Sequence, residues 1–190
     1  LIEAGPRLLA GMSEESSAHA EQFLREMGVN ILLNKRVVDY RDHKVVLEDG
    51  TEIATRTFIW VSGVTGVTIG NLDASLIGRG GRIKVDSFNR VEGMNNVFAI
   101  GDQCIQLADE NYPNGHPQLA QVAIQQGELL AKNLIRMEKG QEMKPFHYRN
   151  LGSMATVGRN RAVAEFSKVK MQGWFAWVMW LVVHLRSILG

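Results

Sequence analysis

The spacing of apolar residues changes along the chain between a helical period and a strand period. A helical period begins after Ser13, a good N-cap, and runs to Met27 with Gly28 as its stop. A second one begins near Pro117 and continues to about Glu138. Strands are predicted where apolar residues alternate or form short unbroken runs: 29–33, 37–40, 44–47, 57–62, 82–85, 96–100, 146–148, 154–157 and 162–166. The pattern favours an α/β fold.

Two pairs of these strands have the spacing of hairpins. Residues 37–40 and 44–47 flank the turn Arg41-Asp42-His43, and residues 146–148 are expected to pair with 154–157. Between the strands at 57–62 and 82–85 the chain is rich in glycine and shows little periodicity. We interpret that stretch as a crossover between two domains.

The C-terminal end differs from the rest of the chain. Residues 174–183 are ten unbroken apolar residues with three tryptophans, followed by His184 and Arg186. A helix that spans a membrane needs about 20 apolar residues, so this one is short. Tryptophans next to a His/Arg end indicate a helix that lies at a membrane surface or is half embedded in it. A buried core helix or an oligomer interface is the alternative.

Composition sets limits on the class of protein. The chain has 190 residues, of which 45% are apolar and 22% charged, and a net charge of +1, so no nucleic-acid partner is indicated. The single Cys104 excludes an internal disulfide and a cysteine-based metal cluster, and we predict no metal site. Leu1-Ile2-Glu3 resembles the tail of a strand already under way, so we expect the chain to be a fragment.

A candidate site is indicated by the run at 96–100 and the helix that follows it. The run ends in Gly101-Asp102, which places a carboxylate at the carboxyl end of a predicted strand, where α/β sheets bind ligands. The helix that starts near Pro117 contributes the N–H groups of its first turn. This combination is typical of a site for a polar cofactor.

The same residues resemble known motifs. Ile83-Lys84-Val85-Asp86 and Asn96–Asp102 resemble the second flavin-binding signature of flavoproteins with two dinucleotide-binding domains. Residues 120–127 are similar to the AQxAxQxG helix of type II NADH dehydrogenases, the non-proton-pumping NADH:quinone oxidoreductases. Tyr148 and residues 152–159 match the segment before the membrane anchor of that family. The resemblance extends over essentially the whole chain, as the carboxyl-terminal portion of such an enzyme.

The resemblance implies an incomplete Rossmann-like, three-layer fold for binding FAD and NAD(P), with a C-terminal membrane-associated helix. The implied parts are the end of an NADH-binding domain at 1–65, the end of an FAD-binding domain at 66–145, a β-rich extension at 146–172 and the start of a membrane anchor at 173–190. It also implies a peripheral membrane protein on the cytoplasmic face of the inner (plasma) membrane, with a possible homodimer. We expect the fragment alone to be inactive.

The resemblance also implies roles for single residues. Gln121 is the expected catalytic residue, because its amide can hydrogen-bond a quinone carbonyl, and Ile124 shares its helix face. FAD is expected to contact Gly101, Asp102, Leu119, Ala120 and Gln121. NADH is expected to contact Glu3, Gly63 and Val64. His116 is expected to cap a loop, with a proton relay as the alternative.

Some family features are missing, which keeps other classes open. The chain contains no GxGxxG turn at the expected places, and Leu151 stands where many members carry a basic residue. A sulfide:quinone or ferredoxin reductase remains possible, although the former needs two redox cysteines. A non-catalytic flavin-domain protein with an interaction tail is the alternative from another class.

Overall fold

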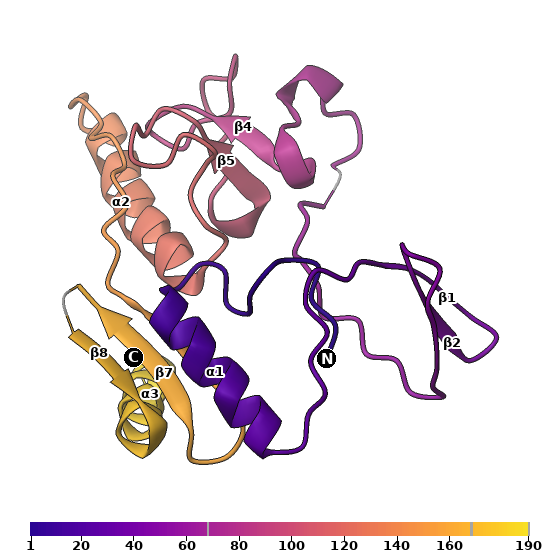
Figure 1. Cartoon of the computed structure of the whole chain (residues 1–190). Helices are drawn as coiled ribbons and strands as arrows, with labels where there is room; N and C mark the ends of the chain where they lie inside the picture. The colour runs from indigo at the N-terminus through magenta and orange to yellow at the C-terminus, as the bar shows by residue number, and fades with distance from the viewer. Residues whose placement is uncertain (68, 168, 190) are drawn as a thin grey trace. The chain divides into compact units, whose positions relative to one another are not determined.

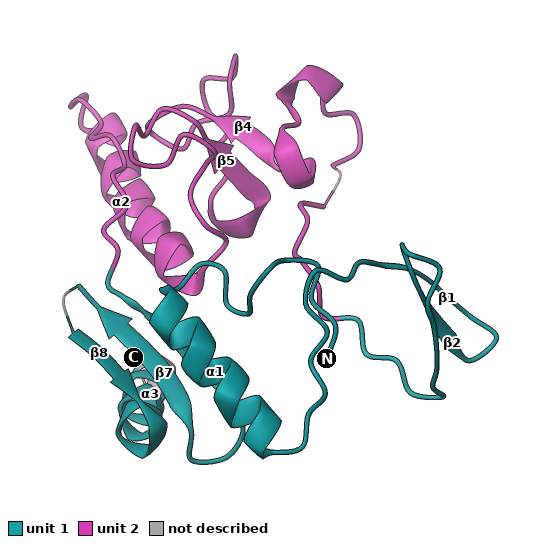
Figure 2. Cartoon of the chain, in the orientation of Figure 1, with its two compact units in different colours: residues 1–60, 151–190 teal, residues 61–150 magenta. Residues whose placement is uncertain are grey.

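Two units make up the fold in the computed structural model, which describes residues 1–67, 69–167 and 169–189 (Figures 1 and 2). Unit 1 combines Leu1–Trp60 with Leu151–Gly190, and unit 2 is Val61–Asn150. Unit 1 therefore joins the two ends of the chain, while unit 2 is one continuous stretch.

Helix α1 (Glu14–Glu26) begins where the sequence predicts. The Ser13 side chain accepts a hydrogen bond from the backbone N–H of Ser16, and Glu14 and Glu15 occupy the first turn, where their charge suits the helix dipole. The N–H of Gly28 closes the C-terminal turn on the carbonyl of Arg25. The expected helix is confirmed.

Unit 1 also holds a three-stranded antiparallel sheet of β6 (Ser153–Thr156), β7 (Ala162–Phe166) and β8 (Val169–Gln172), in that order. Helix α3 (Gly173–Leu189) packs on this sheet. Ala162, Ala164 and Ala176 are fully buried where they meet. Their small side chains let the helix approach the sheet closely. The strand predicted at 162–166 is confirmed.

A second antiparallel sheet in unit 1 is formed by β1 (Val37–Arg41), β2 (Lys44–Leu47) and β3 (Glu52–Ala54). The tight turn places Asp42 and His43 at φ 48° and 58°. Val45 and Leu47 on the central strand are buried. This confirms the predicted hairpin.

Unit 2 is built on a parallel pair, β4 (Ile83–Val85) and β5 (Cys104–Gln106). Short 3₁₀ helices η1 (Ala74–Leu76), η2 (Arg79–Gly81) and η3 (Gly101–Gln103) precede the two strands. Helix α2 (Ala120–Glu138) follows and contacts η3. The start of α2 lies three residues later than Pro117.

The strand predicted at 96–100 is wrong. Phe98 forms only an isolated antiparallel bridge with Arg90, and the strand that joins the parallel pair begins at Cys104. Asp102 therefore precedes β5 instead of ending a strand. The apolar run and the pairing strand are separated by the Gly101 turn, which changes the chain direction between them.

Two other predicted strands are not formed within the described residues. Segment 57–62 has no strand assignment, and Ile59 and Val61 are 75% and 88% exposed. Segment 29–33 makes one parallel bridge, between Ile2 and Leu32. An apolar run becomes a strand only when another strand pairs with it.

The predicted pairing of 146–148 with 154–157 is also wrong. Strand β6 pairs with β7 instead. Residues 144–149 lie along α2, where the side chain of Asn133 donates to the carbonyl of Lys144 and accepts from its N–H. Gln125 does the same with Arg149. Helix side chains thus take the hydrogen bonds that a neighbouring strand would otherwise make.

Candidate functional site

The turn at η3 lies against α2 because Gly101 has no side chain. Gly101 adopts φ +65°, and a Cβ there would be 3.3 Å from the Cβ of Ala123. Its N–H donates to the Oε1 of Gln126 at 2.7 Å. Gln126 is 1% exposed and Gly101 is half-buried, so water has little access to this hydrogen bond. The turn is therefore held at one fixed distance from the helix.

Two more glutamines hold the same turn. The side chain of Gln118 donates to the carbonyl of Asp102 at 3.2 Å. The amide of Gln103 donates to the carbonyl of Val67 at 2.7 Å and accepts from its N–H at 2.8 Å. The Asp102 carboxyl side chain is exposed. The turn thus presents a carboxylate from a backbone that three amide side chains fix.

The hydrogen bonds of Gln103 to Val67 connect the turn to the segment that begins at Gly63. Gly63 and Val64, both exposed, lie three or four residues before Val67. The structure therefore connects the segment expected to contact NADH with the turn expected to contact FAD. Sequence reasoning did not identify Gln103 as the link.

The start of α2 is suited to negative charge. Leu119 is the N-cap, its side chain makes no capping hydrogen bond, and the first turn of α2 holds no acidic residue. The N–H groups of Val122 and Ala123 return to the carbonyl of Leu119. The first turn of the helix therefore contributes no carboxylate of its own to offset the partial positive charge of the N-terminus.

The helix face expected to contact quinone carries an apolar and a polar side chain. Ile124 is 53% exposed and Leu119 is 40% exposed. Gln121 is half-buried and lies three residues before Ile124, so the two share a face. That face therefore combines one amide side chain with one exposed apolar side chain.

Behind the turn lies a buried arginine. The Nε of Arg82 donates to the carbonyl of Cys104 at 2.6 Å, and its Nη2 donates to the carbonyl of His116 at 3.1 Å. Burial lowers the pKa of Arg82, while the negative charge of Asp102 acts in the opposite direction. Burial likewise raises the pKa of the Cys104 thiol, which favours the neutral form.

His116 lies in the loop before α2, and its ring is fully enclosed. Its Nε2 is 3.0 Å from the Oδ2 of Asp109, and both side chains are buried. The rings of Tyr112, Phe146 and Tyr148 surround it. The hydrogen bond to His116 lowers the pKa of Asp109, which keeps the carboxylate ionised. This geometry supports the expected loop-capping role.

Glu3 belongs to unit 1. Its Oε1 accepts a hydrogen bond from the N–H of Gly5 at 2.7 Å, and its backbone N–H donates to the carbonyl of Leu32. The side chain is half-buried. The carboxylate keeps further acceptor capacity, so contact with ribose hydroxyls stays a prediction.

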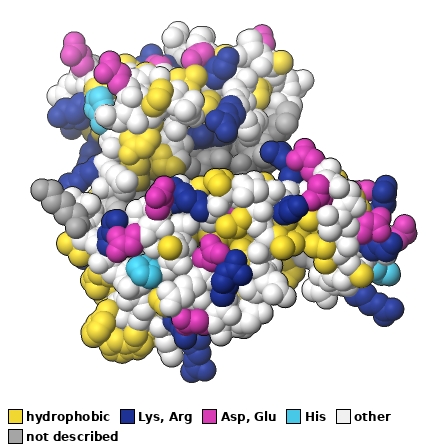
Figure 3. Space-filling view, in the orientation of Figure 1, with side chains coloured by type: hydrophobic (Ala, Val, Ile, Leu, Met, Phe, Trp, Pro, Cys, Tyr) yellow, Lys and Arg dark blue, Asp and Glu magenta, His cyan; other side chains and the backbone are white. Residues whose placement is uncertain are grey.

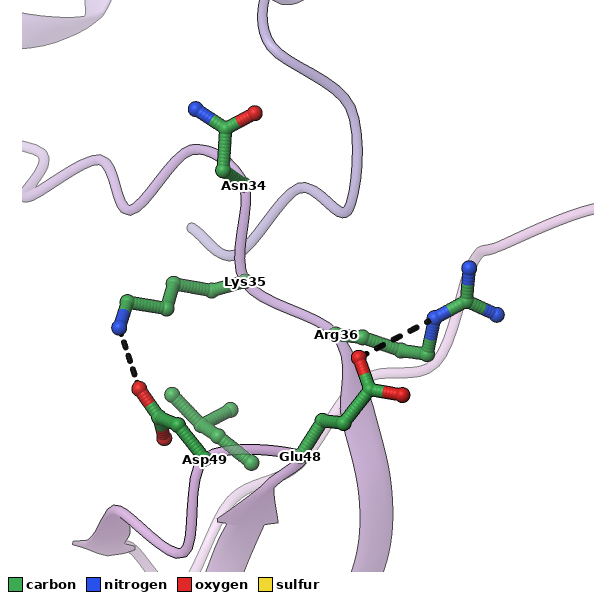
Figure 4. Close-up of a pocket in the computed structure, with 6 residues that line it drawn as sticks. Asn34, Lys35, Arg36, Glu48 and Asp49 are labelled. Carbon is green, nitrogen blue, oxygen red and sulfur yellow. Dashed lines mark hydrogen bonds and ion pairs between the residues drawn. The ribbon is translucent and has the colours of Figure 1, made fainter.

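A small cavity of about 210 Å³ beside β2 is not a candidate for either cofactor. Figure 4 shows Lys35 paired with Asp49 and Arg36 paired with Glu48 across it. These charges neutralise one another, and none of the predicted cofactor residues lines this cavity. Elsewhere in the described ranges, no three His, Cys, Asp or Glu side chains gather as a metal site requires.

Sequence reasoning missed the residues that hold the site together. The turn accepts or donates hydrogen bonds at its backbone through Gln126 and Gln118, and the side chain of Gln103 ties it to the backbone of Val67. Asp109 holds the loop before α2 through His116. Their partners lie seven to 36 residues away in sequence. A local pattern gives no signal for such pairs.

Comparison with known proteins defines the class. Residues 1–127 match the model of the pyridine nucleotide-disulphide oxidoreductase family. The chain belongs to the pyridine nucleotide-disulphide oxidoreductase family.

Within this family, the chain is similar to type II NADH:quinone oxidoreductases. The chain is 36% identical to the type II NADH:quinone oxidoreductase NdhA of Mycobacterium tuberculosis, over 100% of the chain and 42% of that protein. It is 30% identical to the type II NADH:quinone oxidoreductase of Staphylococcus aureus, over 98% of the chain and 47% of that protein. The chain thus spans less than half the length of these relatives.

A solved structure shows the same fold. NDH2 from Plasmodium falciparum, in complex with NADH, superimposes with a TM-score of 0.85 at 20% identity. The match covers 100% of this chain and 54% of that one. The similarity to type II enzymes that the motifs predicted is confirmed, and so is the Rossmann-like α/β fold. Among the helices of the described residues, none is long and apolar enough to cross a membrane.

Proposed function

We propose that this chain forms part of an FAD-dependent NADH:quinone oxidoreductase, which transfers hydride from NADH to flavin and then two electrons to a membrane quinone. The observation that carries the proposal is the attachment of the Gly101–Gln103 turn to α2, a helix whose first turn holds no acidic residue. This arrangement occurs in a chain that is 30–36% identical to type II NADH:quinone oxidoreductases.

The residues present fit FAD. The exposed Asp102 carboxylate can accept a hydrogen bond from a ribityl hydroxyl, and Gly101, which lies against α2, would contact the cofactor through its backbone. The first turn of α2, at Leu119, Ala120 and Gln121, would offer the positive end of the helix dipole to a flavin pyrimidine oxygen. When bound, FAD supplies the two-electron chemistry.

The proposed NADH contacts come from two places in the sequence. Glu3 would accept hydrogen bonds from the adenosine ribose hydroxyls, the usual arrangement for NAD selection. Gly63 and Val64 would pass the backbone close to the nicotinamide. In this proposal 1–65 is the end of the NADH-binding domain and 66–145 the end of the FAD-binding domain.

The quinone would contact Gln121 and Ile124. The Gln121 amide can donate a hydrogen bond to a quinone carbonyl and so orient the ring, while Ile124 gives apolar contact. Gln121 does not titrate, so its role is orientation and not proton transfer. The single cysteine of this chain and its type II relatives favour this reaction over sulfide oxidation.

Helix α3 is proposed as the membrane contact. Its 17 residues extend about 25 Å, which is short of the roughly 30 Å hydrocarbon core of a bilayer. Figure 3 shows hydrophobic side chains over this part of unit 1. Residues of α3 that are exposed include Trp174, Phe175, Met179, Val182 and Val183. In this proposal residues 174–189 of the 173–190 region hold the protein in a peripheral position on the cytoplasmic face of the inner (plasma) membrane. Gly190 lies outside the described residues. A homodimer is compatible with this arrangement.

Flavin binding tests the proposal directly. We expect the purified chain to change the absorbance of added FAD between about 350 and 500 nm. An Asp102→Ala variant should bind FAD about tenfold more weakly, because one charged hydrogen bond is lost. Asp39→Ala, on the exposed hairpin, is the matched control. Equal binding by the two variants would contradict the role of Asp102.

The quinone step is tested separately. In a protein extended to the full length of its type II relatives and loaded with FAD, Gln121→Leu should slow reoxidation of the flavin by a short-chain quinone far more than its reduction by NADH. Equal effects on both half-reactions would remove Gln121 from the quinone site.

A further inference from the structure

Arg82 is buried beside the site without a carboxylate partner. It is 9% exposed, and among the described residues no Asp or Glu lies within ion-pair distance of its guanidinium. Burying a guanidinium is costly unless its donors are satisfied. Here two N–H donors of the guanidinium bond to backbone carbonyls instead of to a carboxylate. These bonds indicate a structural role for the buried side chain.

The two carbonyls belong to the two parts of the proposed flavin site. Cys104 directly follows the Gly101–Gln103 turn, and His116 lies three residues before the N-cap of α2 at Leu119. Nε reaches the first at 2.6 Å and Nη2 the second at 3.1 Å. One planar group thus spans the space between the carboxylate turn and the start of the helix.

The backbone around Arg82 is fixed on both sides. Its carbonyl accepts a hydrogen bond from the N–H of Gly78 at 2.7 Å, and the next residue, Ile83, pairs with Cys104 in the parallel sheet. Gly115 lies so close that a Cβ there would be 2.6 Å from Ile105 and 3.6 Å from Nη1 of Arg82. The guanidinium is therefore held in a packed slot.

We infer that Arg82 is a positioning residue, which sets the separation between the Gly101–Gln103 turn and the start of α2 so that one cofactor meets both. The inference rests on the proposed flavin function. A lysine cannot replace Arg82, because an ammonium lacks the rigid fork that reaches two acceptors in fixed directions.

Amide hydrogen exchange tests this without any cofactor. In Arg82→Met, the hydrogen-bonded N–H groups of Gly101 and Cys104 and those of Val122 and Ala123 should exchange faster together, by about tenfold or more. The last turns of α2 and all of α1 should be unchanged. Arg79→Met, at an exposed arginine in η2, is the control.

Three results would overturn the inference. The first is faster amide exchange in Arg82→Met at only one of the two segments, the turn or the start of α2. The second is a uniform increase in exchange that includes α1. The third is an Arg82→Lys variant whose amides exchange as in wild type. The lysine variant keeps the buried charge and decides the question if the methionine variant loses its fold.

FAD affinity separates this inference from the proposed function. We expect Arg82→Met and Arg82→Lys to bind FAD about tenfold more weakly than wild type, with Arg79→Met unchanged. If wild type binds FAD and the Arg82 variants bind it equally well, the positioning role of Arg82 is contradicted while the proposed function stands. If wild type does not bind FAD, the proposed function fails, and exchange alone decides whether Arg82 couples the two segments.

Discussion

Helices α1 and α2 are attached to their own units by different chemistry. Helix α1 is held to the C-terminal sheet of unit 1 by charged side chains. Helix α2 is held to the turn and the 144–149 segment of unit 2 by neutral amides. Each helix is held to neighbouring segments by polar side chains. Comparing the two shows how charged and neutral contacts differ in their response to pH and salt.

The α1 contacts depend on charge. The Glu165 carboxylate on β7 accepts hydrogen bonds from the N–H and the hydroxyl of Ser13, at the helix start. Near the other end, Arg161 pairs with Glu26 at 2.7 Å and lies 5.3 Å from the centroid of the Phe23 ring. These groups are partly or largely exposed to solvent, so pH and salt act on them.

The α2 contacts do not depend on charge. Gln125, Gln126 and Asn133 each bond to backbone groups of a neighbouring segment. Gln126 and Asn133 are 1% exposed. Burying a satisfied amide costs less than burying a charge, and it adds no net charge beside the proposed flavin site. The neutral attachment therefore suits the unit that carries the proposed flavin site.

The largest effect is expected at Gln126. Gln126→Leu fills a similar volume but leaves the Gly101 N–H buried without a partner, which should lower the free energy of unfolding by about 2–3 kcal/mol. Urea unfolding measures the loss, and it should be the same at neutral and mildly acidic pH. Gln22→Leu, on the exposed face of α1, is the control. A loss that follows pH would contradict the neutral attachment.

A smaller, pH-dependent effect is expected at Glu165. Burial acts to raise its pKa, but hydrogen bonds from Ser13 and Ser16 prevail and lower it below the unfolded value. The stabilisation is therefore present above the unfolded pKa of about 4.3 and is lost as pH falls through the folded pKa. Glu165→Gln should cost about 1 kcal/mol near neutral pH.

The difference between Glu165→Gln and wild type should vanish in acid, where both side chains are neutral. Thermal unfolding across that range measures it. A difference that persists at the acidic end would mean that packing, and not charge, holds Ser13.

The smallest effect is expected at Arg161. Arg161→Gln removes the exposed ion pair with Glu26 and should cost less than about 1 kcal/mol. The loss should shrink in about 1 M salt, where the screening length is roughly 3 Å. Urea unfolding at low and high salt measures both values. A salt-independent loss would point to stacking on Phe23 as the main contribution.

Local sequence signals predicted α1, the first hairpin and β7 correctly, because caps, turn residues and alternation act within a few residues. The AQxAxQxG helix and the Gly101-Asp102 signature were also sufficient to predict the relatives. The glutamines that fix the turn were not predicted, since Gln126 and Gly101 are 25 residues apart. Nothing near either residue in the sequence indicates that they meet.

By itself, the sequence determined the class of protein and the start of α1 at Ser13, and it supplied the prediction of which residues form the candidate site. The tertiary structure decided which apolar runs became strands. Segments 57–62 and 96–100 are as apolar as the paired strands, but a strand is stable only when a second backbone satisfies its N–H and C=O groups. In segment 144–149, side chains of α2 satisfy these backbone groups at Lys144 and Arg149. Burial preference is encoded locally, whereas the hydrogen-bonding partner is set by the packing of distant segments.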